Sequence, residues 1–330
     1  MKTRIVYVLV SDSDDYYYEQ TLISAWSARY WNPNMRILCV VDELTDATLK
    51  ENRTALLEII DEKIVVNLSE GGTAKYTRKE RSRMLKTNLR SYVDGDILYV
   101  DTDTIVCGSL AEVDAFQIPF GAVDDSHSQF DPALCSDPVV HRAKLLGYDV
   151  SSAKNYFNSG VMYMKDTEEV HAFTDKWHAL YMKGQKMGLS FDQPSFISIN
   201  NVQNLITPLD GIYNCQILNG GLPYLADAKI LHYYDVIGNK TFFALSDPAF
   251  LSKTKKCGNL TEEDKLKIIA AKRQIQGEYV LVHGNSLRYW HSSLRHLFLN
   301  NLPAFKFLEF ISRIIRRLCK TRGKCINYNG

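Results

Sequence analysis

The sequence predicts an α/β protein built on a doubly wound sheet with helices on both faces. In the first 68 residues, short apolar runs alternate with amphipathic stretches in the order β-α-β-α-β, which is typical of that class. Residues 5–10 and 97–100 are continuously apolar, as in strands that are covered on both faces. The chain of 330 residues can bury a full core, as one large domain plus an appendage or as two domains.

The N-terminal part supplies three strands and two helices. The spacing of Leu22, Trp26 and Tyr30 predicts the first helix, and Pro33 follows where it ends. The expected elements are a strand at 5–10, a helix at 18–30, a strand at 36–41, a helix at 44–60 and a strand at 63–68.

The next expected strand, residues 97–100, leads into the acidic pair Asp101 and Asp103. Side chains two residues apart on an extended segment share a face, so both carboxylates can point at one spot, with Thr102 pointing away. Open α/β sheets bind ligands at this C-terminal edge of their strands. Two close carboxylates repel unless a cation lies between them, and a hard divalent ion suits oxygen ligands. The alternative interpretation is a solvated acidic turn.

A cluster of cations precedes this strand. It comprises Lys75, Arg78, Lys79, Arg81, Arg83, Lys86 and Arg90. In a helix, Arg83, Lys86 and Arg90 fall on one face. Next to a metal site, that face would give a polyphosphate charge partners on both sides. The alternative is an ordinary solvated helix face.

The α/β pattern continues beyond residue 109. Asn158-Ser159-Gly160 is expected to form a polar turn that feeds a strand at 161–164, and Gly184 is expected to close the following helix. The other expected elements are a strand at 120–125, an irregular stretch at 130–141, helices at 168–182 and 190–199, and strands at 205–209 and 229–233.

The last part of the chain differs in character, and the sequence predicts a domain at 1–245 followed by a helical, basic extension at 246–330. A helix at 260–276 begins with a capping-box pattern, Thr261 and Asp264. A second helix, from residue 302 onward, carries apolar residues on one stripe: Phe307, Leu308, Ile311, Ile314, Ile315 and Leu318. Arg313, Arg316 and Arg317 face elsewhere. Such a helix either lies on an anionic membrane surface or packs on the core with a solvated basic face.

Composition narrows the function classes. The formal net charge of +1 gives no reason to expect nucleic acid as a partner. No apolar run approaches the roughly 18 residues of a membrane span, and residues 5–10 fit a first strand better than a signal peptide. The seven cysteines are scattered without a CxxC motif, which favours reduced thiols and a cytoplasmic location.

Four motifs occur in order: the strand with Asp101-Thr102-Asp103, Asn158-Ser159-Gly160-Val161, Asp192-Gln193, and Leu231-His232-Tyr233 followed by Gly238-Asn239-Lys240. Together they resemble glycosyltransferase family 8, the group of glycogenin-like enzymes and bacterial lipopolysaccharide galactosyl- and glucosyltransferases. The resemblance covers roughly residues 3–245. It implies a GT-A type, Rossmann-like mixed sheet and a nucleotide-sugar-binding catalytic domain at 1–245.

The resemblance implies a metal site. In this family the Asp-X-Asp carboxylates and a late His bind Mn²⁺, and Asp101, Asp103 and His232 occupy those places here. Mixed carboxylate and imidazole ligands suit Mn²⁺ better than Ca²⁺, and Mg²⁺ is an alternative. His283, in His283-Gly284, is a second candidate for the late His.

The resemblance also implies residues for the donor, a UDP-sugar. Asp12 would hydrogen-bond the uracil, Tyr16 or Tyr17 would stack on it, and Lys240 would contact the diphosphate. The full donor-binding set is Val10, Ser11, Asp12, Tyr17, Arg83, Lys86, Thr102, Asn158 and Lys240, with Lys86 as the alternative to Arg83. The residues expected at the reacting sugar are Asp124, which would contact the sugar with Asp125 beside it, Asp192, which would bind its hydroxyls, and Gln193, which would lie under the anomeric carbon.

The function so implied is metal-dependent transfer of a hexose from a UDP-sugar to a glycan or glycolipid hydroxyl, with retained anomeric configuration, in cell-surface polysaccharide or lipopolysaccharide synthesis. The expected location is cytoplasmic, with peripheral contact at the inner face of the membrane through the basic tail. One alternative is a haloacid-dehalogenase-type phosphatase, although Ile105 stands where that motif has Thr. The other is a transferase-like module that binds nucleotide or glycan without turnover.

Overall fold

The structure is a computed structural model that describes residues 2–68, 76–128, 130, 138–233, 245 and 247–273, and a few residues between 301 and 315. The chain forms two compact units, Met1–Glu278 and Tyr279–Gly330. The first unit contains the central sheet and the helices α1 to α8 described below. Lys75, Lys240 and His283 lie outside the described residues.

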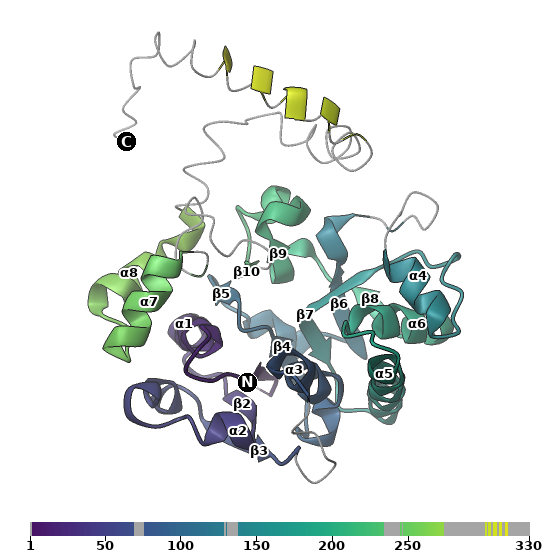
Figure 1. Cartoon of the computed structure of the whole chain (residues 1–330). Helices are drawn as coiled ribbons and strands as arrows, with labels where there is room; N and C mark the ends of the chain where they lie inside the picture. Colours follow the sequence, from purple (N-terminus) through teal and green to yellow (C-terminus); the bar gives the residue numbers. More distant parts are fainter. Residues whose placement is uncertain are drawn as a thin grey trace. The chain divides into compact units, whose positions relative to one another are not determined.

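A seven-stranded mixed sheet forms the centre of the first unit, in the order β3-β2-β1-β4-β7-β6-β8 (Figure 1). Its strands are β1 (Arg4–Leu9), β2 (Ile37–Asp42), β3 (Glu62–Val66), β4 (Ile97–Val100), β6 (Phe120–Asp124), β7 (Phe157–Met164) and β8 (Ile206–Pro208). The first four run parallel, and β7 is antiparallel to both β4 and β6. The predicted α/β class is confirmed.

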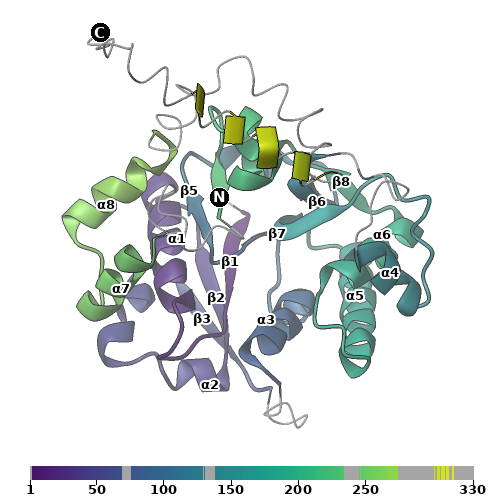
Figure 2. The same ribbon diagram turned by 45° about the horizontal axis from the view of Figure 1, so that its top comes forward.

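Helices cover both faces of this sheet (Figure 2). The helices of the first unit are α1 (Tyr17–Trp31), α2 (Glu43–Asp46), α3 (Arg78–Thr87), α4 (Pro138–Leu145), α5 (Glu168–Lys186), α6 (Gln193–Gln203), α7 (Pro248–Cys257) and α8 (Glu262–Ile269). Short 3₁₀ turns occur at Glu51–Arg53, Ala55–Glu58, Leu89–Ser91, Ala111–Ala115, Asp125–His127, Gly211–Asn214 and Leu222–Tyr224, with a π turn at Ile217–Gly221.

The alternation of side chains along β1 explains why both faces need a cover. Val6 and Val8 are buried in one core cluster with Leu85 of α3 and Trp177 of α5. Tyr7, between them in sequence, points to the other face, where its hydroxyl lies 3.0 Å from Ser24 of α1. A strand covered on both faces must be apolar throughout, which is the pattern that the sequence showed.

A second, three-stranded sheet joins the middle of the chain to its later part. It consists of β5 (Thr104–Val106), β9 (Cys215–Gln216) and β10 (Ile230–His232), in the order β5-β10-β9. The strand β10 is antiparallel to β5 and places His232 opposite Thr104. The backbone N–H of Tyr233 donates to the carbonyl oxygen of Asp103 at 2.9 Å. This pairing brings His232 to the acidic pair.

Several expectations about local structure are wrong. The helix expected at 44–60 is only α2 followed by two 3₁₀ turns, because the Thr48 hydroxyl bonds back to the carbonyl of Thr45 and Glu51 has a left-handed φ of 52°. The expected turn at Asn158-Ser159-Gly160 lies inside β7, where pairing with β4 and β6 holds it extended.

Further wrong expectations concern where helices begin and end. Arg90 lies on a 3₁₀ turn beyond α3, so it does not share a helix face with Arg83 and Lys86. Gly184 lies within α5, which continues to Lys186, and Gly188 at φ 79° follows its end. The stretch expected to be irregular also contains the first turn of α4.

The described part of the predicted extension begins with α7 and α8, and both helices contact α1 within the first unit. The capping box of α8 is confirmed, because the Thr261 hydroxyl accepts from the N–H of Asp264 and the Asp264 carboxylate accepts from the N–H of Thr261. A functional boundary at residue 245 stays a prediction.

In the second unit, the described residues between 303 and 315 are helical. Its exposed apolar side chains are Phe307, Leu308, Phe310, Ile314 and Ile315. Among the described residues, no helix is both long enough and apolar enough to span a membrane.

Candidate active site

A cavity of about 470 Å³ opens at the C-terminal ends of β1 and β4. Most of the site residues expected from the sequence line it: Val10, Tyr17, Arg83, Lys86, Asp101, Thr102, Asp103, Asn158, Asp192, Gln193 and His232. These residues come from seven different segments between residues 10 and 232. The place is the one where open α/β sheets bind ligands.

Three potential metal ligands meet at this cavity. Asp101 follows β4, Asp103 precedes β5, and His232 ends β10. One ligand atom from each of the three lies within 4.8 Å of the other two. Two carboxylates and an imidazole are a donor set that suits Mn²⁺ and similar divalent ions.

The His232 ring is held by contacts on both of its nitrogens. Nδ1 lies 2.8 Å from Oδ1 of Asn214, and Nε2 lies 3.3 Å from Oδ1 of Asp103. A Cβ added to Gly160 would collide with the ring and would come within 2.8 Å of Oδ1 of Asn158. Gly160 and Asn214 therefore position the imidazole, and no sequence pattern singles out Asn214.

The charges of the triad depend on one another. Burial raises the pKa of Asp101, with Lys86 opposing the rise and Asp103 adding to it. Burial also favours a higher pKa for Asp103, but the nearby His232 outweighs it and holds that pKa below its ordinary value. For His232, burial acts to lower the pKa, but the nearby Asp103 carboxylate outweighs it and raises the pKa above its ordinary value. Asp103 is thus a carboxylate, the form that binds a cation.

Two cations of α3 connect the acidic pair to Asp192. Nζ of Lys86 lies 3.1 and 3.2 Å from the two carboxylate oxygens of Asp101 and 3.9 Å from Oδ2 of Asp192. Nε of Arg83 donates to Oδ1 of Asp192 at 3.2 Å, and the hydroxyl of Ser159 donates to its Oδ2 at 2.8 Å. The alternative of a solvated helix face is therefore wrong for these two residues.

Asp125, rather than Asp124, lines the cavity. Its Oδ1 accepts from Nδ2 of Asn158 at 2.8 Å and lies 3.5 Å from Nε2 of Gln193. Asp124 instead lines a separate hollow and accepts from Asn155 at 3.0 Å. The structure thus brings Asp125, rather than Asp124, to the other expected residues, because consecutive side chains at the end of β6 point to opposite sides.

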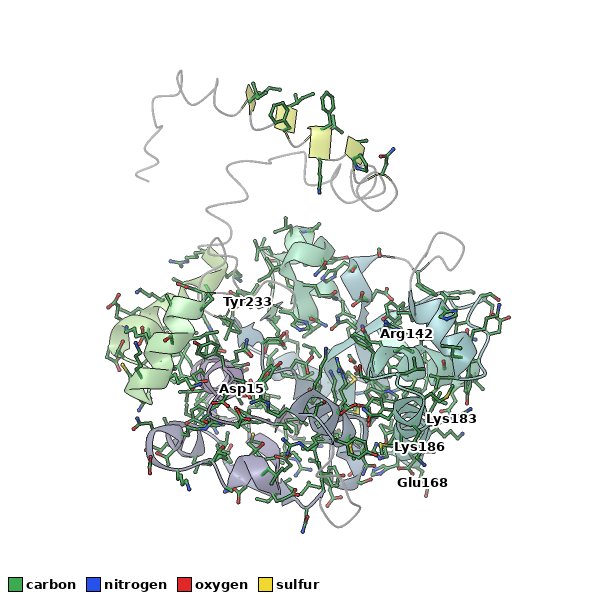
Figure 3. All side chains as sticks on the ribbon, in the orientation of Figure 1. Asp15, Arg142, Glu168, Lys183, Lys186 and Tyr233 are labelled. Carbon is green, nitrogen blue, oxygen red and sulfur yellow. The ribbon has the colours of Figure 1, made fainter. Side chains whose placement is uncertain are left out.

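The loop after β1 is only partly on the cavity. Val10 and Tyr17 line it, whereas Ser11 and Asp12 do not. The Ser11 hydroxyl donates to Asp15, which lies beside the start of α1 (Figure 3), and the Asp12 carboxylate pairs with Arg78. Tyr16 lies under the Lys255 ammonium, 5.0 Å from its ring centre, so Tyr17 is the tyrosine that faces the cavity.

Phe191 is a residue that the sequence analysis missed. It lines the cavity beside Asp192, is 37% exposed, and has the cationic groups of Lys79, Arg83 and Arg142 at 4.6–5.1 Å from its ring centre. Cations above aromatic faces attract the ring electrostatically. Its position directly before Asp192-Gln193 was the only signal in the sequence that could have identified it.

Comparison with known proteins gives two kinds of match. The family model described as glycosyl transferase family 8 matches residues 8–240. A solved structure of the galactosyltransferase LgtC with donor and acceptor sugar analogs is 15% identical, with a TM-score of 0.50 over 80% of this chain and 100% of that chain. A structure of an active-site mutant of LgtC is 16% identical, with a TM-score of 0.51 over 80% of this chain and 99% of that chain. At these identities the likeness shows a shared fold. None of the curated proteins matches the chain.

Proposed function

The chain belongs to glycosyl transferase family 8 and is a glycosyltransferase with a GT-A fold, and we propose that it moves a hexose from a UDP-sugar to a hydroxyl of a glycan or glycolipid. One observation carries the proposal. The two neighbouring carboxylates meet an imidazole from a distant part of the chain, at a cavity that is also lined by Asn158, Asp192 and Gln193. The cavity volume of about 470 Å³ is within the range of small-molecule sites.

We propose Mn²⁺ as the metal of this site, with Mg²⁺ as the alternative. The donor set fits, since Asp101, Asp103 and His232 offer three ligand atoms within 4.8 Å of one another. When bound, the ion would supply the positive charge that stabilises a leaving diphosphate. Lys86 pairs with Asp101 and would help to balance the charge of the same site.

The residues around the triad suggest how the donor is oriented. Tyr17 would stack its ring on the uracil, and Val10 and Thr102 also line the cavity. Asp12 remains a predicted uracil ligand, and binding there would require its Arg78 pair to open. Lys240 remains a predicted diphosphate ligand.

The sugar would lie at the opposite side of the cavity. Its hydroxyls would bind Asn158, Asp192 and Asp125, the last in place of Asp124. Arg83 holds Asp192 at 3.2 Å and fixes the direction of its carboxylate. A fixed carboxylate can read the orientation of individual hydroxyls.

We propose front-face transfer with retention. The bond from the anomeric carbon to the diphosphate oxygen breaks, and a bond to the acceptor oxygen forms on the same face. The acceptor proton passes to the leaving diphosphate oxygen. Gln193, whose amide lies 3.5 Å from Asp125, is the proposed neighbour of the developing positive charge, which its carbonyl dipole would stabilise. An amide is a poor nucleophile, which favours this route over a covalent intermediate.

The proposal is tested with a panel of UDP-, GDP- and CMP-sugars, each with Mn²⁺, Mg²⁺ or EDTA. We expect a UDP-sugar with Mn²⁺ to raise the melting temperature by mass action and to be slowly hydrolysed. Both effects should disappear in Asp103→Asn. Turnover of simple phosphomonoesters would favour the phosphatase alternative, and tight binding without hydrolysis or transfer would favour the binding module.

We further propose that the tail brings the enzyme to anionic membranes, where lipid-linked acceptors for polysaccharide or lipopolysaccharide synthesis are found. The support is the exposure of Phe307, Phe310 and Ile315 together with the arginines of this segment. Cosedimentation with vesicles containing anionic phosphatidylglycerol, but not with neutral vesicles, is the expected result. Equal recovery of the protein in the supernatants of both vesicle types would refute the membrane role.

A further inference from the structure

A second hollow lies beside the cavity, with a volume of about 340 Å³. Its wall includes Asp124, His127, Lys154, Asn155, Leu209 and Tyr224. That volume is at the lower end for small-molecule sites and suits a ligand of the size of one ring. None of these residues lines the catalytic cavity.

The hollow continues the order of the site along the sheet. The strands run β1, β4, β7, β6 and β8 from one side to the other. The proposed nucleotide residues follow β1, the metal residues follow β4, and the proposed sugar ligands come from β7 and the end of β6. The hollow comes next, at the C-terminal ends of the paired strands β6 and β8, where Asp124 ends β6 and Leu209 follows β8. Asp124 and Asp125 separate the two spaces and face one each.

The wall of the hollow combines an aromatic face with polar groups of both kinds. Tyr224 stacks on His127, with ring centres 4.7 Å apart and planes at 29°. Gly211 permits this stack, because a Cβ there would lie 2.7 Å from the Tyr224 ring and 2.8 Å from His127. An aromatic ring in a small pocket with a few fixed polar groups suits a ring that has one apolar face and several hydroxyls.

The polar groups of the hollow complement hydroxyls. Oδ1 of Asp124 accepts from Asn155, and no donor in the described part of the chain reaches its Oδ2. Burial raises the pKa of this half-buried carboxyl, and Asp125 adds to the effect. The exposed Lys154 ammonium adds a donor on the same wall. A sugar hydroxyl can donate to the carboxylate and accept from the ammonium at once.

Hydrogen bonds of Gln216 connect the hollow to the strand that carries His232. The side chain of Gln216 accepts from the N–H of Ser126 at 2.6 Å and donates to the carbonyl of Asp124 at 3.0 Å, and its own N–H donates to Nε2 of His127 at 3.1 Å. Gln216 is also the register partner of His232 in the small sheet. Ser126 and His127 have left-handed φ values of 57° and 50°, a strain that the surroundings must hold.

We propose that this hollow is an acceptor subsite, which binds the sugar ring next to the one that carries the attacking hydroxyl. The inference rests on the proposed function and extends it. The enzyme would recognise at least two linked rings of its acceptor, the second lying on Tyr224 with its hydroxyls on Asp124 and Lys154. A monosaccharide would lack these contacts.

The experiment is ligand-observed saturation-transfer NMR on the full chain with UDP and Mn²⁺. Maltose and cellobiose are the probes, and glucose is the single-ring comparison. We expect both disaccharides to bind more tightly than glucose. Tyr224→Ala should weaken them about tenfold, as loss of an aromatic anchor does, while glucose changes less. Lys154→Ala, an exposed position with little risk to folding, should weaken them about threefold.

Tyr30→Ala is the matched control, because Tyr30 also stacks on a neighbouring ring and lines neither space. It should bind the disaccharides as the unaltered chain does. The inference is overturned if neither disaccharide binds more tightly than glucose, or if both Tyr224→Ala and Lys154→Ala bind them unchanged. Calorimetric titration of UDP with Mn²⁺ on the same samples separates the two proposals, because failure to bind UDP counts against the proposed function itself.

Discussion

Residues 78–91 contain two groups of cations, which differ in the location of the carboxylates that they pair with. Arg81 lies 2.7 Å from the fully buried Asp42, and Arg90 lies 2.7 Å from Asp166, both away from the cavity. Arg83 and Lys86, from the same segment, pair with Asp192 and Asp101 on the cavity wall. We call the first two the outer pairs, which stabilise the fold away from the cavity, and the last two the inner pairs, which hold carboxylates on the cavity wall.

Among the cavity residues, we expect the largest effect on activity from a change in the acidic pair. Asp103→Ala removes one ligand of the triad, and we expect transfer or donor hydrolysis to fall about 1000-fold, or about 4 kcal/mol of barrier. Affinity for Mn²⁺, measured by titration calorimetry, should fall with it. Glu62→Gln is the control, since it alters an exposed pair with Arg36 at β3, 3.0 Å apart. Full activity in Asp103→Ala would refute the metal site.

For the outer pairs, we expect the loss of a cation to lower the stability of the fold. Arg81→Met leaves the Asp42 carboxylate buried without its cation, which we expect to cost about 3 kcal/mol of unfolding free energy. Urea denaturation measures it. Arg36→Met, at an exposed pair, should cost less than about 1 kcal/mol. Similar values for the two variants would mean that the outer pairs do not stabilise the fold.

The two neighbouring carboxylates at the end of β6 provide a further test of which side chains act in the cavity. Asp125→Asn should lower donor hydrolysis about 100-fold, or about 2.7 kcal/mol, because Asp125 contacts Asn158 and Gln193 in the cavity. The effect of Asp124→Asn on the same rate should be at least about ten times smaller, since that side chain faces the second hollow. The reverse order would restore the assignment made from the sequence.

The smallest effect concerns pH. Burial acts to raise the pKa of Asp192, but Lys86, Arg83 and the Ser159 hydroxyl lower it overall. Because the folded pKa lies below the unfolded value near 3.9, the charged form stabilises the fold above about pH 4 and loses that effect as pH falls further. Asp192→Asn should therefore cost about 2 kcal/mol at pH 7 and progressively less below pH 4. A cost independent of pH in urea titrations would contradict this.

Sequence patterns predicted helices and strands correctly where a single apolar periodicity dominates a segment. The apolar runs of β1, β2 and β4 predicted buried strands, and Thr261 with Asp264 predicted the start of α8. The predictions failed where side chains and backbone compete locally, as around Thr48 and Glu51, where a helical pattern became 3₁₀ turns.

Periodicity and local spacing were enough to predict the class of fold, the acidic pair at the end of β4 and the cationic segment before it, because both are properties of adjacent residues. Long-range packing decides which cations face the cavity, which of Asp124 and Asp125 does so, and that Asn214 and Gly160 hold the His232 ring. These choices depend on contacts between segments far apart in the chain: His232, for example, reaches the acidic pair because β10 pairs with β5, more than 100 residues earlier.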